Sequence, residues 1–226
     1  MKNCLITVYI TNYNYGQYIK QSIDSVLEQT YQYFELIIID DGSTDNSISI
    51  IKEYESNDKI QLITQSRKGL NRCNNVALSI AHGKYVVRLD ADDYFLPNAL
   101  ERMVQVLEAN SDIALVFPDY HLVDMDGVII HSVRRHNFEN DVTLYDQPAH
   151  GACTMIRKNI LLEVEGYWEG FECQDGYDIW LKIIRLYKVG NVSLPLFYYR
   201  QHENNLTRNE LRILHTRHKM IERSIK

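Results

Sequence analysis

The sequence has few of the residues that build disulfide scaffolds, zinc modules or membrane spans. Its four cysteines lie far apart among 226 residues and include no CxxC pair. That spacing argues against a disulfide framework or a zinc knuckle and favours reduced thiols. No apolar run approaches the roughly 18 residues that a membrane span needs, and the first residues contain no signal-peptide hydrophobic region. We therefore expect a soluble, cytoplasmic protein.

Excess positive charge and dinucleotide-binding glycines are missing as well. A formal net charge of −6 argues against nucleic acid as a partner. No GxGxxG motif occurs, which argues against a dinucleotide enzyme. The length suits one domain, alone or with an appended part, and allows a sizeable buried core.

The first hundred residues alternate between strand and helix patterns. Apolar runs predict strands at 5–10, 36–39, 60–63 and 85–89. Apolar residues at helical spacing predict helices at about 18–29 and 71–82. Between them, Ser43 or Thr44 is expected to cap a helix that runs to about Glu55. Repeated strand–helix units with short connections predict a parallel, doubly wound sheet.

After Pro97 the pattern becomes mixed. We expect a helix to about Ala109, a strand at 113–117, a hairpin formed by 121–123 and 128–130, a helix at 176–187 and a strand at 192–199. The polar stretch from about Val133 to Gln147 predicts a mobile loop that covers a site. The second half is thus expected to complete a cleft against the first.

Two groups of aspartates stand where predicted strands end. Asp90, Asp92 and Asp93 follow the strand at 85–89, and the turn 40–45 follows the strand at 36–39. Ligands bind at the carboxyl ends of strands in open α/β sheets, where clustered carboxylates hold Mg²⁺ or Mn²⁺ beside substrate phosphates. Either cluster alone is equally typical of turns and helix caps. The two together favour a nucleoside-diphosphate site with a metal ion.

Several segments occur in a set order: 8–14 at the opening strand, 40–45, 71–83, 90–93, 174–180 and 199–202. In this order they resemble a family 2 glycosyltransferase of the GT-A fold, over about residues 5–207. The resemblance implies a Rossmann-like, doubly wound, mostly parallel α/β sheet with a smaller mixed acceptor-side portion. It implies one domain at 1–207, with a nucleotide-binding half at 1–100 and an acceptor half at 101–207, before a helix at 208–226.

The same resemblance implies the reaction. An inverting enzyme that depends on Mn²⁺ or Mg²⁺ would move a sugar from a nucleoside diphosphate to a hydroxyl of a glycan or lipid-linked glycan. The resemblance favours UDP as the nucleoside diphosphate. Bacterial surface polysaccharide synthesis is the implied setting. Asp41 would accept the imide N–H of the base, Tyr13 would supply an aromatic face, Thr11 a backbone contact, and Asp90 would accept from the ribose hydroxyls.

The metal would be bound directly by Asp92. His202 would be a second metal ligand or a contact to the diphosphate, unless its role is structural. The family has Arg-Asn where this chain has Asn74 and Asn75. One expected cation is therefore missing, and Arg72 or Lys68 is expected to replace it.

Asp175 is the expected general base, because it precedes a helix at the far side of the predicted cleft. Asp178, one helical turn later, is the alternative, although a carboxylate there also suits the helix N-terminus. His150 and Trp168 are the expected acceptor contacts.

The last residues, 208–226, form a basic amphipathic pattern. Such a helix packs on its own domain, pairs with another chain in a homodimer, or lies on an anionic membrane surface at the cytoplasmic face. We expect it to serve location or assembly rather than chemistry.

Two other functions fit the acidic motifs less well. A sugar nucleotidyltransferase would resemble its relatives in a Gly-rich basic loop after the first strand, but the segment 11–16 has no lysine or arginine. A non-catalytic module that binds sugar nucleotides or glycans would not need Asp90, Asp92 and Asp175 together.

Overall fold

The computed structural model describes residues 5–135, 151–171, 173–203, 205 and 209–225. Most of the loop predicted at 133–147, and His150, lie outside these residues. None of the described helices is long and apolar enough to cross a membrane.

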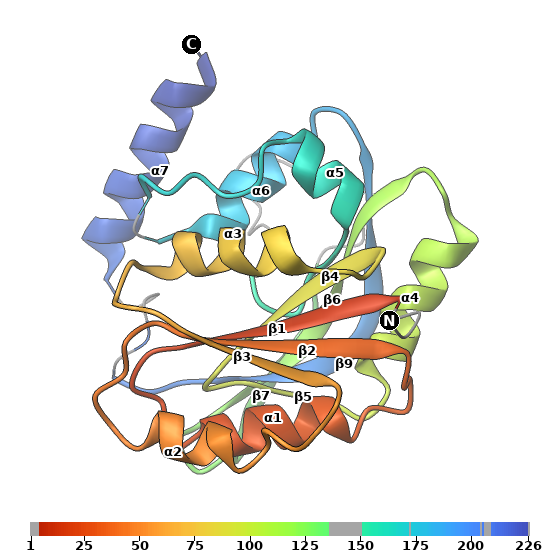
Figure 1. Cartoon of the computed structure of the whole chain (residues 1–226). Helices are drawn as coiled ribbons and strands as arrows, with labels where there is room; N and C mark the ends of the chain where they lie inside the picture. Colours follow the sequence, from red (N-terminus) through yellow and green to blue (C-terminus); the bar gives the residue numbers. More distant parts are fainter. Residues whose placement is uncertain (1–4, 136–150, 172, 204, 206–208, 226) are drawn as a thin grey trace.

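The first half forms the predicted parallel sheet (Figure 1). Its strand order is β3 (Ile60–Thr64), β2 (Phe34–Asp40), β1 (Ile6–Asn12), β4 (Tyr85–Asp90). Helices α1 (Ile19–Leu27) and α2 (Ser47–Lys52) cover one face, and α3 (Leu70–Ile80) covers the other. Alternate side chains of β1 serve the two faces, since Ile6, Val8 and Ile10 pack with α1 whereas Tyr9 packs with α3.

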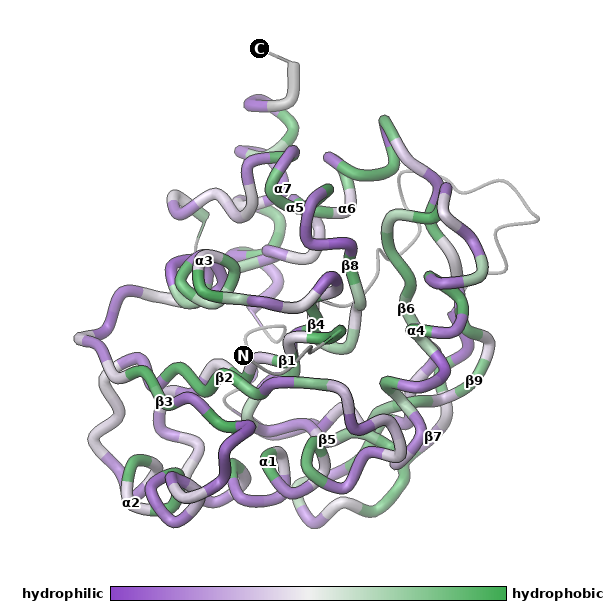
Figure 2. The backbone as a smooth tube through the Cα atoms, turned by 45° about the vertical axis from the view of Figure 1, so that its right-hand side comes forward, coloured by the Kyte–Doolittle hydropathy of each residue, from purple (hydrophilic) through white to green (hydrophobic). Residues whose placement is uncertain are grey.

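The second half extends the same sheet with mixed pairings. β8 (Met155–Arg157) lies antiparallel between β4 and β6 (Ile113–Val123). β6 runs parallel to β9 (Lys188–Arg200). At the edges, β7 (Ile129–Val133) pairs antiparallel with β6, and β5 (Tyr94–Phe95) pairs antiparallel with β9. The remaining helices are α4 (Ala99–Ala109), α5 (Lys158–Glu163), α6 (Asp175–Ile183) and α7 (Glu210–Ile225). Figure 2 shows α7 alternating between hydrophobic and hydrophilic residues.

One predicted helix start is wrong. The helix after β2 begins at Ser47, not after a cap at Ser43 or Thr44. The Ser43 hydroxyl instead accepts hydrogen bonds from the Asn12 side chain at 3.0 Å and the Asn14 backbone at 2.9 Å. Side chains of the acidic turn are therefore used to hold the loop after β1.

Other boundaries differ because strand pairing extends beyond the apolar runs. β6 includes residues 121–123, so the hairpin joins β7 directly to this long strand. β5, β8 and α5 are too short to show a clear pattern in the sequence.

Candidate active site

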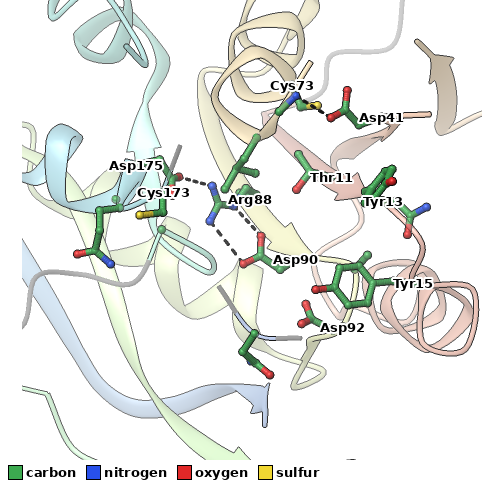
Figure 3. A pocket seen from close by; sticks show the side chains of 18 of the residues that line it. Thr11, Tyr13, Tyr15, Asp41, Cys73, Arg88, Asp90, Asp92, Cys173 and Asp175 are labelled. Carbon is green, nitrogen blue, oxygen red and sulfur yellow. Dashed lines mark hydrogen bonds and ion pairs between the residues drawn. The ribbon is translucent and has the colours of Figure 1, made fainter. Parts of the chain in front are cut away.

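A cavity of about 680 Å³ opens at the carboxyl ends of β1, β2 and β4. Thr11 pairs with Asp90 in the strand register, and Asn12 pairs with Asp40, so both acidic clusters reach this edge of the sheet. Six of the predicted residues line the cavity: Thr11, Tyr13, Asp41, Asp90, Asp92 and Asp175. Figure 3 shows them on both sides of the space.

The acidic turn after β2 is anchored by hydrogen bonds on both aspartates. Asp40 is fully buried and accepts from the Asn12 side chain at 2.7 Å and the Ser43 backbone at 2.9 Å. Asp41 accepts from the backbone N–H groups of Lys68 and Gly69 at 2.9 and 2.8 Å, and from the Gln65 side chain at 2.7 Å. Asp41 therefore fixes the loop before α3 as well as facing the cavity.

That loop carries a cation which the sequence did not single out. The guanidinium of Arg67 lies 3.5 Å from the centre of the Tyr13 ring, and both residues line the cavity. Arg72, expected at this site, instead extends from α3 to Glu169 at 2.9 Å, with about half of its side chain exposed. The structure does not bring Arg72 to the cavity, because its place on α3 faces the segment after α5.

Arg88 is a second cation at this site, and it lies beside Asn74. It extends from the middle of β4 and is 4% exposed. Its Nη1 donates to Oδ2 of Asp175 and lies 3.5 Å from Oδ1 of Asn74. Its Nε is 2.8 Å from Oδ1 of Asp90, without the alignment of a hydrogen bond. A charged residue within the apolar run 85–89 was the available signal, because a buried arginine needs a carboxylate partner.

Burial and ion pairing act on these groups in opposite directions. Burial opposes the charge on Arg88, yet the carboxylates of Asp175 and Asp90 outweigh it and hold the pKa of Arg88 well above its ordinary value. Burial raises the pKa of Asp90 to about 6, although Arg88 offsets part of that effect. Burial and the neighbouring Asp92 and Asp90 raise the pKa of Asp93 well above its ordinary value.

Asp93 and Arg200 hold the turn after β4 in place. The Asp93 carboxylate accepts the Arg200 backbone N–H at 2.9 Å. The Arg200 side chain donates to the backbone oxygens of Asp92 and Met125 and to Gln21, at 2.9, 2.7 and 2.6 Å. Both residues thus fix the position of Asp92.

Asp92 and His202 come together although 110 residues separate them. Oδ2 of Asp92 lies 2.8 Å from Nε2 of His202, and their side chains are 10% and 5% exposed. The His202 ring stacks on Tyr18, and its backbone N–H donates to Asn205. Within the described part of the chain, no three His, Cys, Asp or Glu side chains form a metal cluster. A divalent cation held here would draw further ligands from substrate oxygens, which fits the open coordination expected of Mg²⁺ or Mn²⁺.

Asp175 is the first residue of α6 and lies across Arg88 from Asp90 (Figure 3). Asp178 does not line the cavity; it pairs with Lys182 at 2.9 Å. Gly151 approaches the ion pair so closely that an added Cβ would lie 2.7 Å from Nη2 of Arg88. Only a residue without a side chain leaves this pair undisturbed.

The C-terminal helix α7 packs on its own domain, the first of the three alternatives. Met220 is buried with Phe171 and Tyr177, and the Thr216 hydroxyl lies 3.3 Å from the Cys173 sulfur. This helix also reaches the cavity, because its residues Arg212, Ile213 and Arg217 line it. The expectation that it serves location or assembly rather than chemistry stays a prediction.

Of the two expected acceptor contacts, His150 lies outside the described residues and Trp168 lies within them. Trp168 does not line the cavity, and its ring is covered by the guanidinium of Arg223 at 3.4 Å. Packing of α7 against this segment accounts for its position.

The family model for glycosyl transferase family 2 matches residues 7–165. The chain belongs to this family. It is 32% identical over 219 residues to an uncharacterized glycosyltransferase of Haemophilus influenzae, covering 90% of this chain and 68% of that protein. It is 29% identical over 216 residues to a hyaluronan synthase of Pasteurella multocida, covering 95% of this chain and 22% of the synthase.

Solved structures share the fold. S. aureus TarS (1–349) in complex with UDP-GlcNAc has a TM-score of 0.76 at 19% identity, over 91% of this chain and 61% of that one. The mannosyltransferase PcManGT of Pyrobaculum calidifontis, in complex with GDP-Man and Mn²⁺, has a TM-score of 0.74 at 17% identity, over 97% and 64%. This chain spans less than two thirds of either. The predicted glycosyltransferase family and GT-A fold are confirmed, and an enzyme of this family acts on nucleotide sugars.

Proposed function

We propose that this glycosyltransferase is inverting and metal-dependent, and that it transfers a sugar from a UDP-sugar to a hydroxyl of a glycan or lipid-linked glycan. The observation that carries the proposal is one cavity with Asp41 and Tyr13 on one wall, Asp92 beside them and Asp175 opposite. The structures of S. aureus TarS in complex with UDP and with UDP-GlcNAc support the choice of nucleotide. Hyaluronan and chondroitin synthases among the relatives support a glycan acceptor.

The nucleotide would lie along the ends of β1, β2 and β4. Oδ2 of Asp41 accepts a hydrogen bond from the Gly69 backbone N–H, and a carboxylate oxygen has a further lone pair that would accept the imide N–H of uracil. Tyr13 would flank the base. Arg67, which lies over the Tyr13 ring, would supply the cation that the sequence predicted at Arg72 or Lys68. Thr11 and Asp90 would face the ribose.

Asp92 and His202 would hold a divalent cation, supplying one carboxylate oxygen and one imidazole nitrogen. When bound, such an ion offsets the negative charge that develops on the departing diphosphate. Arg200 keeps Asp92 in position through its backbone contact.

Asp175 would remove the proton from the acceptor hydroxyl as that hydroxyl attacks the sugar. Both of its described side-chain contacts, from Arg88 and Asn74, fall on Oδ2. Oδ1 is therefore the oxygen left to receive the proton.

UDP should bind more tightly with Mn²⁺ or Mg²⁺ than with EDTA, because Asp92 and the diphosphate would otherwise repel each other. Calorimetric titration measures the difference directly. Asp92→Ala should lose most of the metal-dependent gain, whereas Asp112→Ala, at an exposed ion pair with Lys188, should keep it. Equal UDP affinity with metal and with EDTA would refute the metal dependence.

Asp41→Ala should weaken UDP binding more than pyrophosphate binding. A lost hydrogen bond to a charged group costs about 1.5–3 kcal/mol, and the loop before α3 also loses its anchor. Parallel calorimetric titrations of UDP and pyrophosphate separate the two effects. Asp45→Ala, in the same acidic turn, is the control, since the described contacts of the Asp45 carboxylate are with Gly16 and Ser47 and Asp45 does not line the cavity. An equal loss for both ligands would mean that Asp41 only anchors the loop.

A further inference from the structure

Arg217 lines the cavity from α7, and it has no carboxylate partner among the described residues. Its Nε donates to the Gln174 side chain at 2.8 Å, and its guanidinium lies 4.8 Å from the centre of the Tyr177 ring. Arg88, by contrast, pairs with both Asp90 and Asp175. Arg217 is therefore a cation at the cavity whose charge no described group neutralises.

The guanidinium is held in a fixed orientation. Gln174 has a left-handed backbone, with φ of 62°, at the start of α6. Contacts of Thr216 with Cys173 and burial of Met220 fix α7 to the same segment. The Nε atom of Arg217 is hydrogen-bonded to Gln174, and one face of its guanidinium lies against the Tyr177 ring. The two terminal Nη groups are therefore available to a ligand. Such a fork matches the paired oxygens of a phosphate or a carboxylate.

The position of Arg217 assigns it to the acceptor side. Gln174 directly precedes Asp175, the proposed base, so Arg217 contacts the residue next in sequence to the one that would meet the acceptor hydroxyl, and both Arg217 and Asp175 line the cavity. The metal pair, Asp92 and His202, belongs to the turn after β4 and the segment after β9.

We propose that Arg217 forms an anion subsite for the acceptor, which carries a phosphate or carboxylate group near the hydroxyl that receives the sugar. This inference rests on the proposed function, because it takes Asp175 as the base. Arg212 and Ile213 continue the same wall of the cavity one helical turn earlier. The acceptor class is therefore an anionic glycan or a phosphate-linked one, rather than a neutral sugar.

The test uses protein saturated with UDP and Mg²⁺, so that the diphosphate site is already filled. Wild type, Arg217→Gln and Lys219→Gln are titrated with inorganic phosphate and with glucuronate, followed by NMR. Lys219 is exposed on the same helix and does not line the cavity, which makes it a matched control. We expect Arg217→Gln to weaken anion binding by about 10- to 100-fold, with Lys219→Gln and all UDP affinities unchanged. The tighter anion identifies a phosphate-bearing or a carboxylate-bearing acceptor.

Three results would overturn the subsite: no anion binding to UDP-loaded wild type, equal anion binding by Arg217→Gln, or a loss of UDP affinity in that variant. The last would make Arg217 a donor contact. If Arg217→Gln fails to fold in a thermal melt, Arg217→Lys replaces it; that variant keeps the charge but not the fork and should bind the anions more weakly than wild type. If the wild-type protein does not bind UDP at all, the proposed function fails. The anion titration can then be run on protein without UDP, and it still tests Arg217.

Discussion

Asp175→Asn should lower the rate of sugar transfer by about 10²–10⁴-fold and leave UDP affinity nearly unchanged. Asparagine keeps the shape of the side chain and an acceptor oxygen for Arg88, but it cannot take a proton at neutral pH. The nucleotide contacts proposed for Asp41 and Tyr13 lie on the opposite wall of the cavity and should not sense the change. A transfer assay run beside UDP titrations measures both quantities.

Asp178→Asn is the matched control for this experiment. Asp178 lies on the same helix and is also buried, but it pairs with Lys182 instead of facing the cavity. Its replacement should reduce stability and leave transfer largely intact. An active Asp175→Asn enzyme together with an inactive Asp178→Asn enzyme would place the base one helical turn later than we propose. Both assays must be run below the unfolding temperature, since Asp175→Asn also removes a buried ion pair.

Arg88→Met should lower the free energy of unfolding by about 3–5 kcal/mol, because it removes one partner of a buried ion pair and leaves its carboxylates without a cation. Asp175 is 8% exposed and Asp90 27% in their side chains, so water can compensate only in part. Transfer should fall as well, since Asp175 loses the contact that orients it. Chemical denaturation and the transfer assay check the two effects.

Arg72→Ala is the control for charge removal at an exposed ion pair. Its partner Glu169 is 42% exposed and Arg72 is 47% exposed, and such pairs contribute about 0–1 kcal/mol. If Arg88→Met were as stable as Arg72→Ala, the bridge between Asp90 and Asp175 would not hold the site together.

Much of the nucleotide-binding half could be predicted from local patterns. The strands β1, β2 and β4 are apolar runs that end in polar or acidic residues, and parallel strands deliver those ends to one edge. Asp41, Asp90 and Asp92 consequently line one cavity, as their positions after the strands indicated. Asp175 could be selected because it opens a helix with apolar residues behind it.

Short elements were missed for a physical reason. β8 has three residues and β5 has two, so neither contains enough sequence to show a period. Each exists because a longer neighbour, β6 or β9, offers unpaired backbone groups beside it. The extension of β9 to Lys188 has the same origin.

By itself, the sequence determined the family, the α/β class and the acidic side chains of the site, because these depend on local pattern and on the order of motifs. The tertiary structure decided which cations serve that site. Arg88 reaches Asp175 across 87 positions of sequence, and Arg217 reaches Gln174 across 43. Arg72, which the sequence assigned to the same site, pairs with Glu169 instead. A charge acts on what lies within a few ångströms of it, and those distances arise only when β4, α6 and α7 pack together.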